Sequence, residues 1–157
     1  MIGIIQGRLT VSRKKLQTFP KNPFLEFKTA SKIGYDFIEF FSEEIINKRN
    51  PIWSKEGIRE YIKITKLNKI KTYSFIDEYP ISHSLAKLKT LENSLKTLER
   101  AQKLNIKKFI IPLFGRSLIN SKNKFKIYKN LSIIAKACQK SKIELLLESN
   151  MTPKNFD

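Results

Sequence analysis

Short apolar runs alternate along this chain with longer segments whose apolar residues recur every three or four positions. Five runs are rich in β-branched and aromatic residues and predict strands over residues 2–5, 36–41, 72–76, 108–114 and 143–148. Subtracting their first residue numbers gives intervals of 34, 36, 36 and 35 residues. Each interval has room for one strand, one helix and their loops. The pattern therefore predicts five βα units and a parallel sheet.

Each of the four segments between these strands predicts a helix. Pro23 can open the first helix and Gly34 fits its end, while Ser54 is a suitable N-cap for the second. The third pattern ends at Asn105, and its apolar positions are Leu85, Leu88, Leu91, Leu95, Leu98, Ala101 and Leu104. The apolar positions of the fourth are Phe125, Tyr128, Leu131, Ile134, Ala135 and Cys138. We interpret Cys138 as a small buried hydrophobe rather than a nucleophile.

Two α/β architectures fit this alternation. A five-stranded doubly wound sheet fits the length, but it usually has a glycine-rich turn after the first strand. Here the turn reads QGRLT over residues 6–10, with neither GxGxxG nor GxxxxGK[ST]. A (β/α) barrel of TIM type needs about 250 residues, so the chain would form an incomplete barrel of about five βα units. Residues 148–153 are typical of a loop leading into another helix.

The strong positive charge changes this picture little. The formal net charge is +17, from 31 Lys and Arg against 14 Asp and Glu. Only six of the basic residues are Arg, the residue favoured for base readout and two-pronged phosphate binding. The lysines are spread along the whole chain. We therefore interpret them as solvated faces that adhere weakly to polyanions, and we expect no specific nucleic-acid partner.

Composition excludes several other classes of protein. With 41% hydrophobic residues the chain can form a core, which argues against wholesale disorder. The single cysteine excludes a disulfide framework and a multi-cysteine zinc site. We find neither a secretory leader nor an apolar run of membrane-spanning length. We expect a soluble cytoplasmic protein with no membrane partner.

Polar residues follow every predicted strand, at the edge where barrel enzymes place their chemistry. They are Gln6 and Arg8; Glu39 and Glu43; Asp77, Glu78 and His83; Arg116; and Glu148. Acids are scarce in this chain, so their recurrence at one edge favours a functional site there. Because the sequence has one histidine, a histidine-rich metal site is excluded within these five units.

Several of these residues have two interpretations. Glu148 ends an apolar strand and suits a metal ligand or a general base, or else an ion pair with a lysine. His83 suits proton transfer or sugar hydroxyls, or else a solvent-facing or capping position. Glu39 interrupts an apolar run and either points into a polar barrel mouth or is buried with a cation. Gln6 can hydrogen-bond its own turn, and Arg8 can pair with a neighbouring acid.

Taken in order, five segments resemble a known family. They are IGIIQGRL (2–9), GYDFIE (34–39), NPIWS (50–54), IIPL (110–113) and LLLE (145–148). Together they resemble the sugar phosphate isomerase/epimerase proteins of the xylose isomerase-like TIM barrel superfamily. The resemblance covers essentially the whole chain and implies that residues 1–157 are the N-terminal portion of one barrel domain, without strands six to eight.

The resemblance implies a metal-dependent isomerase or epimerase of a sugar or sugar phosphate. Such enzymes bind a divalent ion (Mn, Mg, Co or Zn) at the barrel mouth and move a proton next to a carbonyl through an enediolate. Glu148 matches the strand-five glutamate, as metal ligand and acid/base group. Gln6, Arg8, Glu39 and His83 map onto the substrate side of the mouth. A homo-oligomer is compatible with this family.

The remaining metal ligands and the second glutamate of the family belong to strands that this chain lacks. We therefore expect these 157 residues to be an inactive fragment of a larger chain. Two alternatives stay open. One is an apurinic-site endonuclease-like DNA-binding protein of the same superfamily, which needs histidines at several strand ends. The other is a non-catalytic barrel protein that has lost its metal site.

Overall fold

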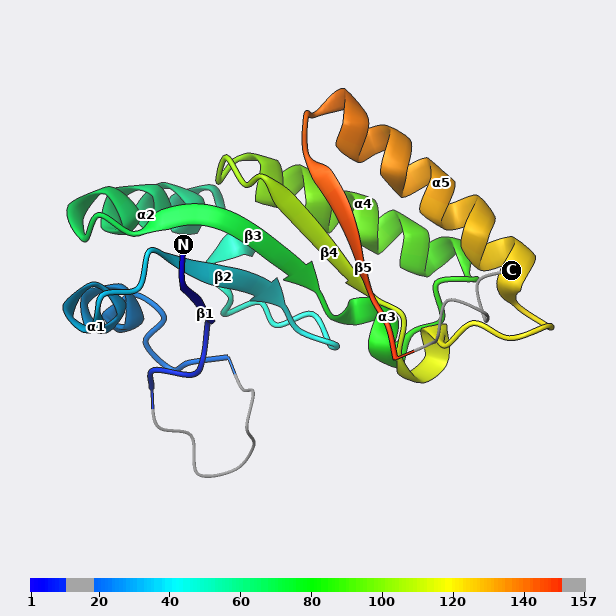
Figure 1. The fold of residues 1–157 in the computed structure, drawn as a ribbon, viewed down its shortest axis with the longest axis horizontal. Coiled ribbons are helices and arrows are strands. Elements are labelled where there is room, and N and C mark those ends of the chain that lie inside the picture. The colour runs from blue at the N-terminus through cyan, green and yellow to red at the C-terminus, as the bar shows by residue number, and fades with distance from the viewer. Residues whose placement is uncertain (11–18, 151–157) are drawn as a thin grey trace.

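The computed structural model describes residues 1–10 and 19–150 and contains a five-stranded sheet with helices between its strands (Figure 1). The strands are β1 (Gly3–Ile5), β2 (Phe37–Ser42), β3 (Lys71–Asp77), β4 (Lys108–Pro112) and β5 (Glu144–Glu148). The helices are α1 (Leu25–Ile33), α2 (Lys55–Leu67), α3 (Tyr79–Ser82), α4 (Leu88–Gln102) and α5 (Lys124–Lys140), with 3₁₀ turns η1 (Pro51–Trp53) and η2 (Gly115–Ser117). Each predicted strand is confirmed. Residues 151–153, part of the predicted C-terminal loop, lie outside the described residues.

Strand order decides between the two architectures. All neighbouring strands are parallel and their order is β1-β2-β3-β4-β5, without a reversal. A doubly wound sheet reverses its order at a switch point and carries helices on both faces. Sequential right-handed crossovers instead place every helix on the same face, as Figure 1 shows for α2, α4 and α5. The barrel-type α/β fold is therefore confirmed, with five of its parallel strands and the helices between them present among the described residues.

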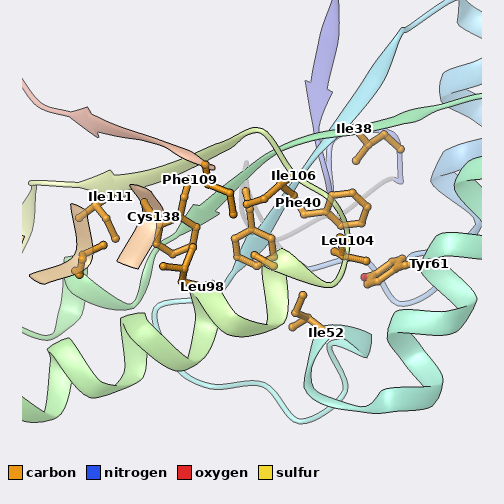
Figure 2. Close-up of a cluster of buried hydrophobic side chains, with 14 of the residues drawn as sticks. Ile38, Phe40, Ile52, Tyr61, Leu98, Leu104, Ile106, Phe109, Ile111 and Cys138 are labelled. Carbon is orange, nitrogen blue, oxygen red and sulfur yellow. The ribbon is translucent and has the colours of Figure 1, made fainter. Parts of the chain in front are cut away.

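The core lies between the sheet and this helical layer. Because side chains alternate along a strand, every second residue of β2 and β4 faces the helices: Ile38, Phe40, Phe109 and Ile111 are all 1% exposed or less. Figure 2 shows them beside residues of α2 and α4. Tyr61 of α2 packs edge-on against Phe40, with ring centroids 5.0 Å apart. Each such buried side chain stabilises the fold by about 1.5–3 kcal/mol.

The predicted helix boundaries rest on capping geometry. Ser54 accepts a hydrogen bond at its Oγ from the Gly57 amide at 2.9 Å, which caps α2 as predicted. Gly34 follows α1 in the left-handed conformation, with φ of 98°, and Asn105 follows α4 with φ of 56°. Both ends are confirmed. Helix α1 begins at Leu25, two residues after Pro23.

Some predicted core positions are wrong. Leu88 is 68% exposed, because α4 begins at this residue and Leu85 packs into the core from the preceding loop. In α5, Phe125 is 77% exposed and Ala135 is also exposed, whereas Ile127 is buried. Helix α5 has apolar residues on two of its sides, so a spacing of three or four residues can be followed along either side. Packing against β5 and α4 buries only one of them. Cys138 is confirmed as a buried free thiol, and burial raises its pKa to about 11.

The other face of the sheet is covered by no helix in the described part of the chain (Figure 1). Its residues alternate with the core residues and are only partly buried, among them Phe37, Glu39, Lys108 and Ile110. In a closed barrel this face would line the interior. None of the described helices is long and apolar enough to cross a membrane.

Candidate functional site

The carboxyl ends of the five parallel strands meet at one edge of the sheet, and the polar residues picked out from the sequence lie along it. Gln6 directly follows β1, Glu39 lies within β2, and Glu148 is the last residue of β5. Glu39 lies between the buried residues Ile38 and Phe40 and therefore points to the uncovered face. Glu148 is in register with Pro112, on the same face as Ile110, and is exposed. The fold therefore places two carboxylates on the side that a barrel would enclose.

Glu39 is held in a defined position on this face. Its Oε2 accepts a hydrogen bond of 2.5 Å from Ser74 Oγ of β3, and its backbone oxygen accepts from the Gln6 amide at 2.9 Å. Burial raises the pKa of the Glu39 carboxyl, the Ser74 hydrogen bond opposes that shift, and the charge of Glu148 raises the pKa further. The two glutamates are thus close enough to interact electrostatically, although they come from β2 and β5.

Glu148 is the more accessible of the two. Its strand position is fixed because its backbone oxygen accepts a 2.8 Å hydrogen bond from the Leu113 amide and Pro112 lies opposite it in register. Its side chain is exposed and forms no ion pair with any lysine of residues 1–10 and 19–150. An available carboxylate at the strand end is what a ligand or base requires.

The other predicted substrate-side residues lie apart from this pair. Gln6 is 1% exposed, and its Nε2 donates to the Tyr61 hydroxyl at 3.1 Å, on the helical side of the sheet. Its Oε1 is buried without a hydrogen-bond partner among the described residues. Arg8 is exposed in the turn after β1. Their roles in substrate binding stay predictions.

His83 belongs to a separate aromatic pair. Its ring stacks on Tyr79, with centroids 4.0 Å apart and planes 3° from parallel, and its Nδ1 lies 3.3 Å from the Tyr79 backbone oxygen. Ser117 fixes this loop, donating from Oγ to the Pro80 oxygen at 2.6 Å and accepting from the Leu85 amide at 2.8 Å. In the described part of the chain no hydrogen bond joins His83 to either glutamate, and its substrate role stays a prediction.

Two further strand-end acids are used by the fold. Asp77 is completely buried, and its Oδ1 accepts from Ser42 Oγ at 2.8 Å and from the Tyr79 amide at 3.3 Å. Burial raises its pKa, and Ser94 and Ser42 act in the opposite direction. Glu43 accepts from the side-chain amides of Asn47 at 2.6 Å and Asn50 at 3.0 Å, which holds the loop after β2.

Sequence analysis missed Glu26, which shapes the turn after β1. This helix α1 residue is 1% exposed and accepts from the Gly7 amide at 2.8 Å, the Leu9 amide at 3.0 Å and Thr10 Oγ1 at 3.1 Å. Gly7 has φ of 93°, a conformation that glycine adopts readily. One feature of the sequence could have identified Glu26: it lies four residues before Ala30 and so places a charge on the apolar face of the predicted helix.

A divalent metal ion requires more ligands than this edge provides. A catalytic site uses three or more protein ligands, with an open position for substrate. No group of three His, Cys, Asp or Glu residues suited to a metal ion occurs within residues 1–10 and 19–150. Glu148 and Glu39 are two candidates that fall short of such a set. The described residues alone therefore do not fit a catalytic metal.

Three solved structures with a similar fold are sugar epimerases or isomerases. D-Psicose 3-epimerase with D-tagatose from Clostridium cellulolyticum H10 superposes with a TM-score of 0.69 at 14% identity, over 94% of this chain and 52% of that one. D-Psicose 3-epimerase in the presence of D-fructose gives 0.66 at 16% identity, over 92% and 51%. A sugar phosphate isomerase/epimerase from Parabacteroides distasonis ATCC 8503 gives 0.59 at 13% identity, over 97% and 56%.

These likenesses concern the fold. No family model matches the sequence, and no curated protein does. The chain spans about half the length of the solved structures that it matches. The barrel-type architecture that the resemblance implied is therefore confirmed over most of this chain.

Proposed function

We propose that this chain forms the first five βα units of a metal-dependent isomerase or epimerase that acts on a sugar or sugar phosphate. The observation that carries the proposal is the pair Glu39, within β2, and Glu148, at the end of β5: both lie on the uncovered face, where burial raises the pKa of Glu39 and the charge of Glu148 raises it further. Two fold relatives, both D-psicose 3-epimerases, were solved with D-tagatose and in the presence of D-fructose, which supports a sugar substrate.

The proposed chemistry is proton transfer on the carbon next to the sugar carbonyl. Glu148, whose side chain is accessible, removes that proton and leaves an enediolate; an acid on the opposite face of the sugar then returns a proton. The raised pKa of Glu39 makes its carboxyl a hydrogen-bond donor to sugar oxygens over a wider pH range than an ordinary glutamate. Arg8 and His83 are the remaining candidates for the substrate side, from the loops after β1 and β3, whereas Gln6 is buried against Tyr61.

The proposal includes three further βα units, supplied by a longer chain or by a partner. A divalent ion would polarise the sugar carbonyl or hydroxyl when bound, with Glu148 as one ligand and the rest of the set on those units. The 157-residue chain alone would then lack turnover, because it offers neither the ligand set nor the second acid/base group. DNA cleavage of the apurinic-site type is less well supported, since His83 is the single histidine.

The intact mass of the protein from its natural source tests first whether the natural chain is longer than these 157 residues. A mass near 18.4 kDa would mean that five units must assemble with a partner or a second copy to be active. A mass of roughly 30 kDa would fit one complete barrel. Turnover of ketoses and their phosphates by the isolated 157-residue chain would contradict the proposal that it is inactive alone.

Glu148→Gln in the natural protein tests the chemistry. We expect turnover to fall by about 10²–10⁴-fold, since an amide cannot accept the proton. Glu144→Gln is the matched control, because Glu144 lies on the same strand and face but pairs with Lys108 at 3.0 Å near the other edge. We expect this control to stay within a few-fold of the parent. Equal losses in both variants would overturn the role of Glu148.

A further inference from the structure

A cavity of about 560 Å³ lies at the amino ends of the strands, at the edge opposite to Glu148. Its walls come from the last turns of α2, the start of β3 and the loop between α4 and β4. The bordering loops turn through Lys69 and Asn105, with φ of 55° and 56°. Its volume falls within the range of about 300–1,000 Å³ found for small-molecule sites.

The cavity carries a concentrated positive charge. Four lysines line it, and no Asp or Glu does: Lys66, Lys69, Lys71 and Lys107. None of the four forms an ion pair with any of the described residues. The neighbouring Lys108, by contrast, is paired with Glu144 at 3.0 Å. Crowded like charges without counter-ions are relieved when an anion binds.

Helix dipoles account for only part of this charge. Helices α2 and α4 both end at this edge, and each C-terminus carries about half a negative charge. Together they offset about one of the four lysine charges. The remaining excess of about three positive charges suits an anion with about three or four negative charges.

The rest of the wall is mostly apolar, with Thr65, Thr72 and Asn105 as its polar residues. Met1 is 67% exposed, and Ile62 and Tyr73 are half-buried, so their side chains offer apolar surface to a ligand. Free inorganic phosphate would leave this surface in contact with water. A flat apolar group attached to the anion would cover it and gain the free energy of burial.

We propose that this cavity binds an aromatic organic phosphate with about three or four negative charges, such as a nucleoside di- or triphosphate. The aromatic group lies against Met1, Ile62 and Tyr73, and the phosphates reach the lysines. This site is separate from the carboxyl edge, and the proposal does not depend on the function proposed there.

Titration of the 157-residue chain with N-methylanthraniloyl-ATP, followed by fluorescence anisotropy, tests the site. We expect K66Q/K107Q to bind roughly tenfold more weakly, a loss of about 1.4 kcal/mol. The matched control is K122Q/K136Q, which removes the same charge from exposed residues outside the cavity. We expect the control to change the affinity by no more than about twofold. Equal losses would overturn the proposal, because net charge alone would explain the binding.

Two further measurements use the unmodified chain. Inorganic triphosphate has the charge without the aromatic group, and we expect it to compete at least about tenfold less well than ATP. Amide chemical shifts on adding ATP should change at residues 69–73 and 104–107. Equal competition by triphosphate, or shifts spread over lysines throughout the chain, would show non-specific binding to a polyanion and overturn the proposal.

Discussion

At the scale of single residues, three acids of similar sequence context have different roles. Glu26 is buried and binds backbone amides of the turn after β1. Asp77 is buried against α4, and Glu39 lies half-buried on the uncovered face. What separates them is the direction in which the backbone points each side chain. Only Glu39 is available to interact with Glu148.

Asp77→Asn tests the cost of burying this carboxyl. The pKa of Asp77 is raised in the folded state, so above about pH 4, where an unfolded aspartate ionises, the native state binds more protons. Stability should therefore fall as pH rises through this window towards the folded-state pKa. In urea unfolding between pH 4 and pH 8, we expect the variant to lose less stability than the parent.

At pH 8 the Asp77→Asn variant should be at least as stable as the parent. Asp77 Oδ2 and Ser94 Oγ both lack a hydrogen-bond partner of ordinary geometry among the described residues. The side-chain amide of the variant can donate a hydrogen bond to Ser94 Oγ. Such a hydrogen bond contributes about 1 kcal/mol. Glu92→Gln, at an exposed position, should keep the parental pH dependence. An unfolded Asp77→Asn variant, or an unchanged pH slope, would contradict this account.

At the scale of elements, the repeat is marked by its helix-to-strand turns. Gly34, Lys69, Asn105 and Lys142 all have positive φ, between 55° and 98°, and each stands two or three residues before a strand. Their spacings, by subtraction, are 35, 36 and 37 residues. Glycine fills this position once, so three of the turns cost some backbone strain. The recurrence shows that each βα unit closes in the same way.

Gly57→Ala tests whether helix propensity or packing against η1 decides the stability of α2. Propensity alone predicts that alanine stabilises α2 by about 0.8–1 kcal/mol. A Cβ at Gly57 would, however, lie 2.2 Å from the Pro51 backbone oxygen of η1. We therefore expect a lower midpoint of urea unfolding, by the equivalent of about 1–3 kcal/mol.

Ser132→Ala is the control for this substitution, because it changes an exposed position within α5. Propensity should act alone there and raise the midpoint slightly. A higher midpoint for Gly57→Ala as well would mean that η1 moves aside at little cost, and that its packing on α2 does not position the loop after β2.

At the scale of the whole molecule, the sheet has an uncovered face and open edges. Strand β5 pairs with β4 on one side only within the described residues. The alternating amides of a strand point to opposite sides, and the Glu144 amide donates to Lys107 of the β4 side. The amides of Leu145 and Leu147 therefore face the open edge.

Hydrogen exchange of the 157-residue chain should resolve this alternation. We expect the Leu145 and Leu147 amides to exchange at least about tenfold faster than the Leu146 amide, because only the latter donates within the sheet. Leu146 is thus an internal control on the same strand. If all three were equally protected, another chain would have to pair with this edge, and self-association would be the next property to measure.

The sequence alone was enough to predict the element types and the parallel sheet. Apolar periods of two and of three to four repeat at nearly constant spacing, and Ser54, Gly34 and Asn105 mark helix ends through local geometry. These signals act within a few residues and need no knowledge of the fold. The periodicity left a doubly wound sheet and a barrel open; the family resemblance favoured the barrel, and the strand order confirms it.

Only the tertiary structure decided which way the polar side chains point. Gln6 and Asp77 turn towards the helical layer, Glu39 faces Glu148 from a distant strand, and Glu26 binds the turn after β1. Side-chain direction depends on strand register, and a shift of one residue reverses the face. The bulge between β2 and β3 changes that register locally. The roles of these residues therefore depend on contacts between elements that are separated by 19 residues for Glu26 and Gly7, and by 55 for Gln6 and Tyr61, which periodicity along the chain does not record.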